Sequence, residues 1–154
     1  MVAFIDLDRP SEIRRLGPAH AGARFPSVSP DGTLVAYVSG EVGQDEIFLT
    51  RLPGGQGKMQ ISTEGGGWTT IGPRGDAVIY RAPDGGFMSV PITATPEVKI
   101  GQPKKLFDWG SSWLPFYGLA HDGQRGIAAV PVSERRQVPS LSIVQNWHLE
   151  FPTR

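Results

Sequence analysis

The stretch Phe25-Pro-Ser-Val-Ser-Pro-Asp-Gly-Thr-Leu-Val-Ala-Tyr-Val-Ser39 decides how the whole chain is interpreted. It predicts a short strand, a tight Ser-Pro-Asp-Gly turn and an apolar second strand. In such a turn Pro presets φ, Asp can bond its own backbone and Gly tolerates positive φ. The run that follows, residues 33–38, is rich in β-branched and aromatic residues, which is typical of strands covered on both faces. A buried β-hairpin is therefore expected here.

Two weaker copies of this pattern follow, over residues 68–82 and 116–130. Their turns, at Pro30, Pro73 and His121, are spaced by 43 and 48 residues. A period of roughly 40–50 residues is typical of propeller blades. Further strand candidates come after the copies, at residues 46–52, 58–62, 87–92, 103–107 and 141–147. The repeating unit is therefore predicted to be a four-stranded antiparallel meander.

The predicted fold is all-β, with about three β-propeller blades per chain in a single partial-propeller domain, residues 1–154. Residues 1–23 would supply the last two strands of a preceding blade. Residues 24–63 and 64–107 would each form a blade, and residues 108–154 an incomplete one. In the first segment we expect strands at residues 2–8 and 12–16, joined by a turn at Pro10 and Ser11. No stretch combines a cap, a 3.6-residue period and about ten residues free of Gly and Pro, so no helix is predicted.

Composition removes several classes of function. Fifteen basic and fifteen acidic residues balance, which argues against a general electrostatic attraction to nucleic acid or to an acidic membrane. Cysteine is absent, so thiolate chemistry and disulfides are excluded. No apolar run approaches the ~18 residues of a membrane span. No basic segment followed by an apolar one marks a signal peptide at the N-terminus.

A family resemblance rests on five stretches of the sequence. The stretch 25–39, then Glu46-Ile-Phe-Leu and Gln60-Ile-Ser-Thr, resembles the repeat of TolB-type, WD-repeat-like β-propellers. Ala82-Pro-Asp-Gly-Gly-Phe-Met-Ser-Val-Pro and Leu141-Ser-Ile-Val-Gln-Asn-Trp resemble the C-terminal propeller of bacterial serine/threonine kinases and related TolB-like sensors. The second copy departs from the pattern at Gly72 and Arg74, and the third at Ala120 and His121. The resemblance implies a sensor or scaffold in a periplasmic or other extracytoplasmic location.

The chain shows no convincing catalytic, cofactor or metal motif. It lacks the Gly-x-Ser-x-Gly of a serine hydrolase elbow. Residues 54–58 have the wrong spacing for a phosphate loop, so a hairpin tip is favoured. His20, His121 and His148 share no ligand spacing. Asp6 and Asp8 would face the same way on a strand without the rest of a calcium loop. We predict no catalytic residue, no cofactor and no metal.

Candidate binding residues lie in the loops expected at one end of the blades. Aromatic and Arg side chains are the types that carry binding energy at interfaces. Those expected at the channel end are Arg24, Trp68, Arg81, Trp113, Phe116, Arg135 and Arg136. The alternative is that the Trp side chains pack between blades and that the Arg135–Arg136 pair is a solvated tip.

The predicted strand count raises the question of how a ring would close, because closed propellers have about four to eight blades. One interpretation is a fragment whose missing blades belong to a longer chain. The other is self-association, with a head-to-tail dimer of about six blades in which one copy's leading strands complete the other's last blade. Open sheet faces and edges would otherwise invite aggregation.

Three functions remain after these arguments. The preferred one is a non-enzymatic β-propeller module that recognises a protein, peptide or other ligand, with neither nucleic acid binding nor membrane insertion. The second is the propeller portion of a hydrolase, either prolyl-oligopeptidase-like or a glycosidase that uses paired carboxylates such as those of Asp45, Glu46 and Asp84. The third is a self-assembling structural partial propeller without a ligand.

Overall fold

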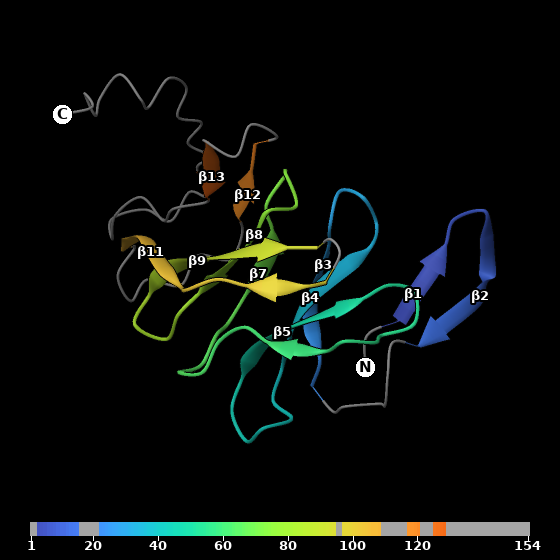
Figure 1. Ribbon diagram of the computed structural model, residues 1–154, viewed down its shortest axis with the longest axis horizontal. Coiled ribbons are helices and arrows are strands. Elements are labelled where there is room, and N and C mark those ends of the chain that lie inside the picture. Colours follow the sequence, from blue (N-terminus) through green and yellow to red (C-terminus); the bar gives the residue numbers. More distant parts are fainter. Residues whose placement is uncertain (1–2, 16–21, 95–96, 109–116, 121–124, 129–154) are drawn as a thin grey trace, which may run out of the picture. The chain divides into compact units, whose positions relative to one another are not determined.

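The computed structural model describes residues 3–15, 22–94, 97–108, 117–120 and 125–128. Every regular element in these ranges is a β-strand, and all strand pairs are antiparallel. The chain divides into two compact units, residues 1–111 and 112–154; Figure 1 labels most of their strands. None of the described segments is a helix that is long and apolar enough to cross a bilayer.

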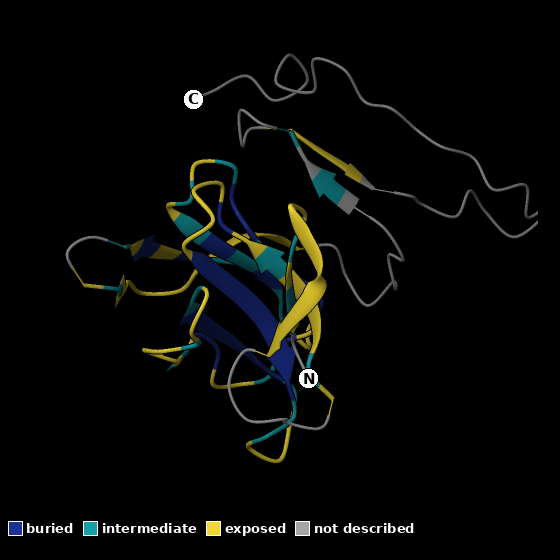
Figure 2. Cartoon of the chain, turned by 90° about the vertical axis from the view of Figure 1, so that its right-hand side faces the viewer, coloured by how far each residue is buried: buried dark blue, intermediate teal, exposed yellow. Residues whose placement is uncertain are grey.

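The first complete sheet is a meander of four strands in the order β3-β4-β5-β6. Its strands are β3 (Arg24–Val28), β4 (Leu34–Ser39), β5 (Glu46–Arg51) and β6 (Met59–Gln60). All six residues of β4 and five of the six in β5 are buried, as the dark central strands of Figure 2 show. The loss of polar alternation expected for strands covered on both faces is therefore observed.

The second sheet contains five strands, with the order β10-β9-β8-β7 and with β11 also paired to β9. They are β7 (Thr69–Ile71), β8 (Ala77–Arg81), β9 (Gly86–Thr93), β10 (Lys99–Ile100) and β11 (Lys104–Asp108). Both β10 and β11 pair with β9, at Ile92–Thr93 and at Gly86–Ser89 respectively. β10 and β11 follow one another along the same edge of β9. The second sheet is therefore also a four-stranded meander, with its outermost strand divided into β10 and β11.

The turn between the first two strands has the same hydrogen bonds in both sheets. Ser29 N donates to Leu34 O and Gly32 N to Ser29 O, both over 2.9 Å. The same bonds in the second sheet run from Gly72 N to Ala77 O and from Gly75 N to Gly72 O, over 2.9 and 2.8 Å. Gly32 and Gly75 have φ of 72° and 71°, a conformation that favours glycine. The departure of the second copy from the Ser-Pro-Asp-Gly pattern therefore leaves the turn geometry unchanged.

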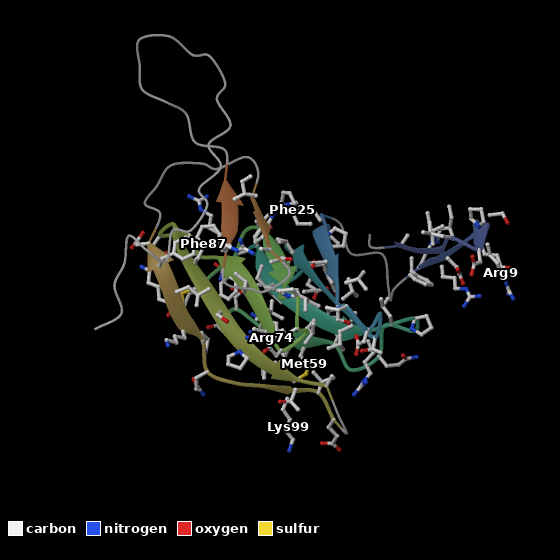
Figure 3. All side chains as sticks on the ribbon, turned by 90° about the horizontal axis from the view of Figure 1, so that it is seen from above. Arg9, Phe25, Met59, Arg74, Phe87 and Lys99 are labelled. Carbon is white, nitrogen blue, oxygen red and sulfur yellow. The ribbon has the colours of Figure 1, made fainter. Side chains whose placement is uncertain are left out.

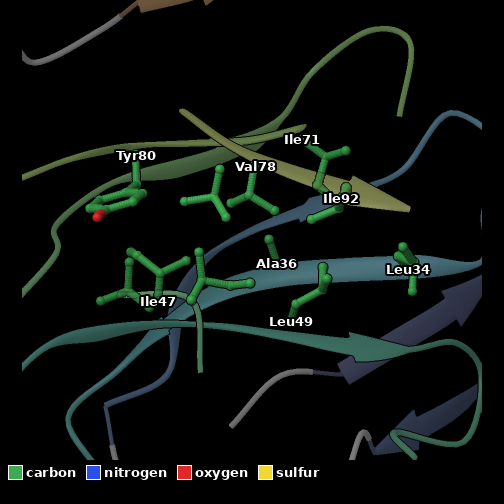
Figure 4. Close-up of a cluster of buried hydrophobic side chains, with 11 residues drawn as sticks. Leu34, Ala36, Ile47, Leu49, Ile71, Val78, Tyr80 and Ile92 are labelled. Atoms are coloured by element: carbon green, nitrogen blue, oxygen red, sulfur yellow. The ribbon is translucent and has the colours of Figure 1, made fainter. Parts of the chain in front are cut away.

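The hydrophobic core lies between the two sheets (Figure 4). Leu34, Ala36, Ile47 and Leu49 are among the side chains that the first sheet contributes, and Val78 is among those from the second. A polar link joins the innermost strands: Ser27 Oγ accepts a hydrogen bond from Ile71 N over 2.9 Å and lies 3.2 Å from Thr70 Oγ1. The two sheets therefore pack face to face and share one core.

The opposite face of the first sheet, which we name the far face, carries a second and smaller cluster. Val35, Tyr37 and Phe48 are buried there, and Phe4, Ala23 and Leu52 pack against them. The Tyr37 and Phe48 rings stack with centroids 6.0 Å apart. Burial, assisted by the charge of Glu41, raises the pKa of Tyr37 to about 12.

The N-terminal hairpin consists of β1 (Ala3–Asp6) and β2 (Arg9–Arg15). The predicted turn at Pro10 and Ser11 is wrong, because both residues lie within β2 and the turn falls at Leu7 and Asp8. Asp6 Oδ1 closes that turn by accepting a hydrogen bond from Asp8 N over 3.1 Å. Proline is tolerated in β2 because this strand pairs on one side only.

The second unit contains the hairpin of β12 (Tyr117–Leu119) and β13 (Gly126–Ala128). Ala120 N donates to Arg125 O over 2.8 Å. Its donor and acceptor are five residues apart, as in the Ser29–Leu34 and Gly72–Ala77 bonds. By this correspondence, β12 and β13 take the first and second strand positions of the repeat. The predicted strand at residues 141–147 lies outside the described residues.

Candidate functional site

An open hollow of about 280 Å³ lies at one end of the two sheets of the first unit. The β4–β5 loop, the connection from β6 to β7 and the β8–β9 turn meet there. The residues that line it are Gln44, Asp45, Glu64, Gly65, Gly66, Gly67 and Pro83. Three segments separated by about twenty residues each in sequence thus form one concave surface.

Gly65 and Gly66 are required by close packing at the floor of this hollow. A Cβ on Gly65 would lie 2.8 Å from Pro83 Cγ, and the φ of Gly65 is +91°. A Cβ on Gly66 would lie 2.8 Å from Ile47 Cγ1. Larger residues would separate the connection from the strands beneath it. The glycines therefore let the chain cross from one sheet to the next in contact with both.

The amide groups of the glycine run 65–67 are all occupied. Gly65 N donates to Glu46 Oε1 over 3.0 Å, Gly66 N to Asp45 O over 2.8 Å and Gly67 N to Arg81 O over 2.9 Å. Glycine-rich loops that bind phosphate do so with N–H groups directed at the anion. These three N–H groups are directed into the protein, so this run does not offer an anion-binding loop.

Glu46 beneath the hollow is a buried carboxylate, with only 1% of its surface exposed. It accepts hydrogen bonds from Gln44 Nε2 over 2.5 Å, from Gly65 N and from the Ser62 hydroxyl. Ser62 Oγ in turn accepts a bond from Ile47 N over 2.9 Å. A buried charge is costly unless it is hydrogen-bonded in this way. Glu46 therefore fixes the position of the loop and strand ends that surround the hollow.

Arg24 forms one side of the same end of the sheet. Its guanidinium forms an ion pair with Asp45 and donates to Gly22 O over 3.0 Å. Both side chains of the ion pair are 44% exposed, so its contribution to stability is small. Its effect on the hollow is electrostatic, because it neutralises Asp45 and leaves Glu64 as the uncompensated acid among the lining residues.

Three aromatic side chains, from the residue before β7 and from β9 and β11, lie close together. The Trp68 ring meets Phe87 edge-on with centroids 6.5 Å apart, and Phe87 stacks on Phe107 at 4.7 Å; Figure 3 labels Phe87 on its strand. Such pairs contribute about 0.5–1.5 kcal/mol beyond their burial. Trp68 therefore packs against an aromatic side chain of its own sheet.

An ion cluster lies beside these rings. Lys105 Nζ is 2.8 Å from Asp108 Oδ2 and 3.1 Å from Asp84 Oδ2. The two carboxylates raise the pKa of Lys105, that of Asp108 more strongly. A hydrogen bond from Gly86 N, followed by one from Lys105, lowers the pKa of Asp84. Asp84 is thus occupied in holding the β8–β9 turn.

The structure describes three of the seven predicted site residues. Arg24 begins β3, Trp68 directly precedes β7 and Arg81 ends β8. All three lie at the end of the sheets that carries the hollow, since Arg24 pairs with Asp45 and Gly67 bonds to Arg81 O. The other four, Trp113, Phe116, Arg135 and Arg136, lie outside the described residues.

Sequence reasoning did not select the lining side chains Gln44, Glu64 and Pro83, and it named Asp45 only as a carboxylate of the glycosidase alternative. Each is an ordinary loop residue, and only their convergence distinguishes them. The one available signal was the glycine run, which marks a close approach between segments. Within the described part of the chain, no group of three or more His, Asp or Glu side chains could hold a metal ion.

Comparison with known proteins identifies the fold. TolB from Acinetobacter baumannii superimposes with a TM-score of 0.56 and 21% identity, over 77% of this chain and 31% of that one. The structure reported for the TolB candidate of Agrobacterium tumefaciens has 23% identity and a TM-score of 0.49, over 69% of this chain and 40% of that one. Neither the family models nor the curated proteins compared with the chain give a match.

The chain therefore has a partial TolB-like β-propeller fold, as the family resemblance implied. It spans 31% and 40% of the length of these two structures. At this level of identity the likeness concerns the fold alone, because one fold hosts many functions.

Proposed function

We propose that the chain is a non-enzymatic recognition module that binds a peptide segment in the hollow at the end of its two sheets. The observation that carries this proposal is the convergence of three loops on one open concavity above a fixed floor. The floor is held by the bonds of Glu46 and by the tight packing of Gly65 and Gly66. Loops on a rigid scaffold are where proteins most often place binding residues.

The lining chemistry favours a ligand rich in hydrogen-bond donors. Asp45 and Glu64 contribute carboxylate oxygens and Gln44 an amide, while the N–H groups of the glycine run are already bonded inside the protein. Such a site offers more acceptors than donors. Peptide amides and Lys or Arg side chains are donors. We therefore propose a peptide with a basic side chain, and not a phosphorylated or acidic one.

A titration followed by two-dimensional NMR tests this proposal with defined probes. The probes are an octapeptide of alternating Gly and Lys and its counterpart with Glu in place of Lys. We expect the Lys peptide to shift the amide signals of Gly65, Gly66 and Gly67, and the Glu peptide to leave them unchanged. Equal or larger shifts with the Glu peptide, or none with either, would contradict the proposal.

Two matched variants locate the contact. Glu64→Gln removes the uncompensated acid of the hollow and should weaken the Lys-peptide response severalfold. Glu97→Gln removes an exposed acid from the β9–β10 loop, at the opposite end of its sheet, and should leave the response intact. If both variants weaken binding equally, the attraction is a general effect of charge and not of this site.

We also propose the blade boundaries that the repeat suggests. The sheet β3–β6 falls in the proposed blade 24–63, and most of the sheet β7–β11 in the proposed blade 64–107. Residues 1–23 would belong to a preceding blade and residues 108–154 to a third. A location outside the cytoplasm goes with the TolB resemblance and belongs to the same proposal; cell fractionation with an antibody to the chain tests it.

A further inference from the structure

Two equivalent residues on the innermost strands differ sharply in exposure. Val28 ends β3 and Ile71 ends β7, each directly before the first residue of the repeated turn. Val28 pairs with Val35 across its sheet, and Ile71 pairs with Val78 in the same way. Yet Ile71 is only 6% exposed, whereas Val28 is 51% exposed. The repeat itself therefore shows how much of this position a neighbouring blade covers.

What covers Ile71 is the inner half of the first sheet. Leu34 and Ala36 of β4 belong to the core that contains Ile71, and Ser27 of β3 accepts the hydrogen bond from Ile71 N. The first and second strands of one blade thus cover the first strand of the next. By the same rule, Val28 would be covered by the first two strands of another blade that packs on the far face.

The far face is already covered where its middle strands run. Val35, Tyr37 and Phe48 are at most 6% exposed, and Phe4 of the N-terminal hairpin packs against them. Val28 on β3, at the side of the same face, is exposed. Because Val28 pairs with Val35, its exposed surface is continuous with an existing packing interface.

The hairpin β12–β13 has the strand positions needed to cover the exposed surface at Val28. Its turn bond, from Ala120 N to Arg125 O, places it in the first and second strand positions of the repeat. Ile127 follows Arg125 by two residues, as Ala36 follows Leu34, so Ile127 occupies the position that Ala36 uses against Ile71. Ile127 is 41% exposed. Ile127 and Val28 are therefore both exposed apolar residues, and they hold the two positions of the repeat that contact each other between neighbouring blades.

We propose that β12–β13 of a second copy of this chain packs on the far face beside β3, so that Ile127 of one copy covers Val28 of the other. The contact joins two different surfaces, which makes the association head-to-tail, and it closes as a ring if the rotation allows. This inference concerns assembly and does not depend on the proposed peptide site.

Cysteine crosslinking tests the proposed contact directly, because the natural chain has no cysteine. A Val28→Cys copy and an affinity-tagged Ile127→Cys copy are mixed and treated with a short bismaleimide. We expect a covalent dimer that contains one copy of each. The control replaces Val28→Cys by Val42→Cys, which is equally exposed at 52% but lies in the β4–β5 loop, and should give no such dimer.

Two results would overturn the proposal. One is crosslinking only within a single chain, seen when Val28→Cys and Ile127→Cys are combined and diluted with unsubstituted protein. The other is a monomer in sedimentation velocity at every concentration that stays in solution. Val28→Glu supplies an independent measurement: it should shift the association to much higher concentration, while Val42→Glu should not. Equal association of the two variants would also reject the contact.

Discussion

At the scale of single residues, alanine substitutions at the neighbouring Gly66 and Gly67 distinguish the cost of a steric clash from the cost of replacing a glycine as such. Gly66→Ala would place a Cβ 2.8 Å from Ile47 Cγ1 and 3.1 Å from Ser62 Oγ, whereas the nearest atom to a Cβ at Gly67 is Arg81 O at 3.9 Å. We expect Gly66→Ala to lower the free energy of unfolding by about 1–3 kcal/mol, the usual cost of overpacking. Gly67→Ala, measured in the same urea titration, should change it by less than half as much.

The buried carboxylate of Glu46 makes the Ser62 hydroxyl important. Ser62→Ala removes both the donor to Glu46 and the acceptor of Ile47 N. A buried polar group left without a hydrogen-bond partner lowers the free energy of unfolding by about 1–3 kcal/mol, so we expect a destabilisation in this range. Thr63→Ala, at the exposed neighbouring position, is the control. Equal unfolding midpoints for the two variants would show that Glu46 does not depend on Ser62.

Asp31 in the first turn links stability to pH. The hydroxyl of Ser29, followed by the N–H and hydroxyl of Thr33, lowers the pKa of Asp31 in the folded protein. A depressed pKa stabilises the fold above the unfolded pKa of about 3.9, and this stabilisation is lost as the pH falls through the folded value. We expect the stability advantage of the natural chain over Asp31→Asn to be full at neutral pH and to disappear in acid. Thermal unfolding across this range measures it, and a pH-independent difference would contradict the expectation.

At the scale of the elements, hydrogen bonds between β3 and β7 add to the core that the two sheets share. Ser27→Ala leaves Ile71 N, at a buried position, without its acceptor, which should cost about 1–3 kcal/mol. Thr70→Val keeps that bond and removes the hydroxyl contact at 3.2 Å, so its cost should be smaller, about 0.5–1.5 kcal/mol. If circular dichroism and Trp fluorescence give one coincident transition for both variants, the sheets form one cooperative unit.

The elements also show which features were predictable from sequence. The meander was predictable because Pro, Asp and Gly have local reasons to form these turns, and because the second copy keeps the essential Gly75. The interruption between β10 and β11 was missed because β10 has only two residues. The N-terminal turn was misplaced because Pro10 looks like a turn residue unless the strand is known to be an edge.

The candidate site was less predictable than the fold for a physical reason. Turn and strand preferences act between near neighbours, whereas the hollow depends on contacts between Gly65 and Pro83 or Arg24 and Asp45, about twenty residues apart. The residue type, together with the end of the blade at which each loop was expected, was enough to propose Arg24, Trp68 and Arg81. They gave no means of selecting Gln44 or Glu64 among other polar loop residues.

At the scale of the whole molecule, the repeat makes each blade depend on its neighbours for burial. Val28 and Ile71 have the same place in the repeat, yet their exposed fractions are 51% and 6%. The difference follows from the sheet that lies against Ile71 and not against Val28. Full burial of such a side chain stabilises by about 1.5–3 kcal/mol. Stability of the chain is therefore expected to depend on what occupies the far face.

This dependence gives a prediction about unfolding at different protein concentrations. If a second copy occupies the far face, association stabilises the folded state by mass action, and the melting temperature should rise by about 2 °C for each tenfold increase in concentration. Val28→Glu should abolish the rise, because a carboxylate cannot be buried beside Ile127 without a partner. It should leave the melting temperature at the lowest concentration nearly unchanged, since Val28 is half exposed in the single chain. Calorimetry of both proteins over the same dilution series measures the two slopes; parallel slopes would mean that any association uses another surface.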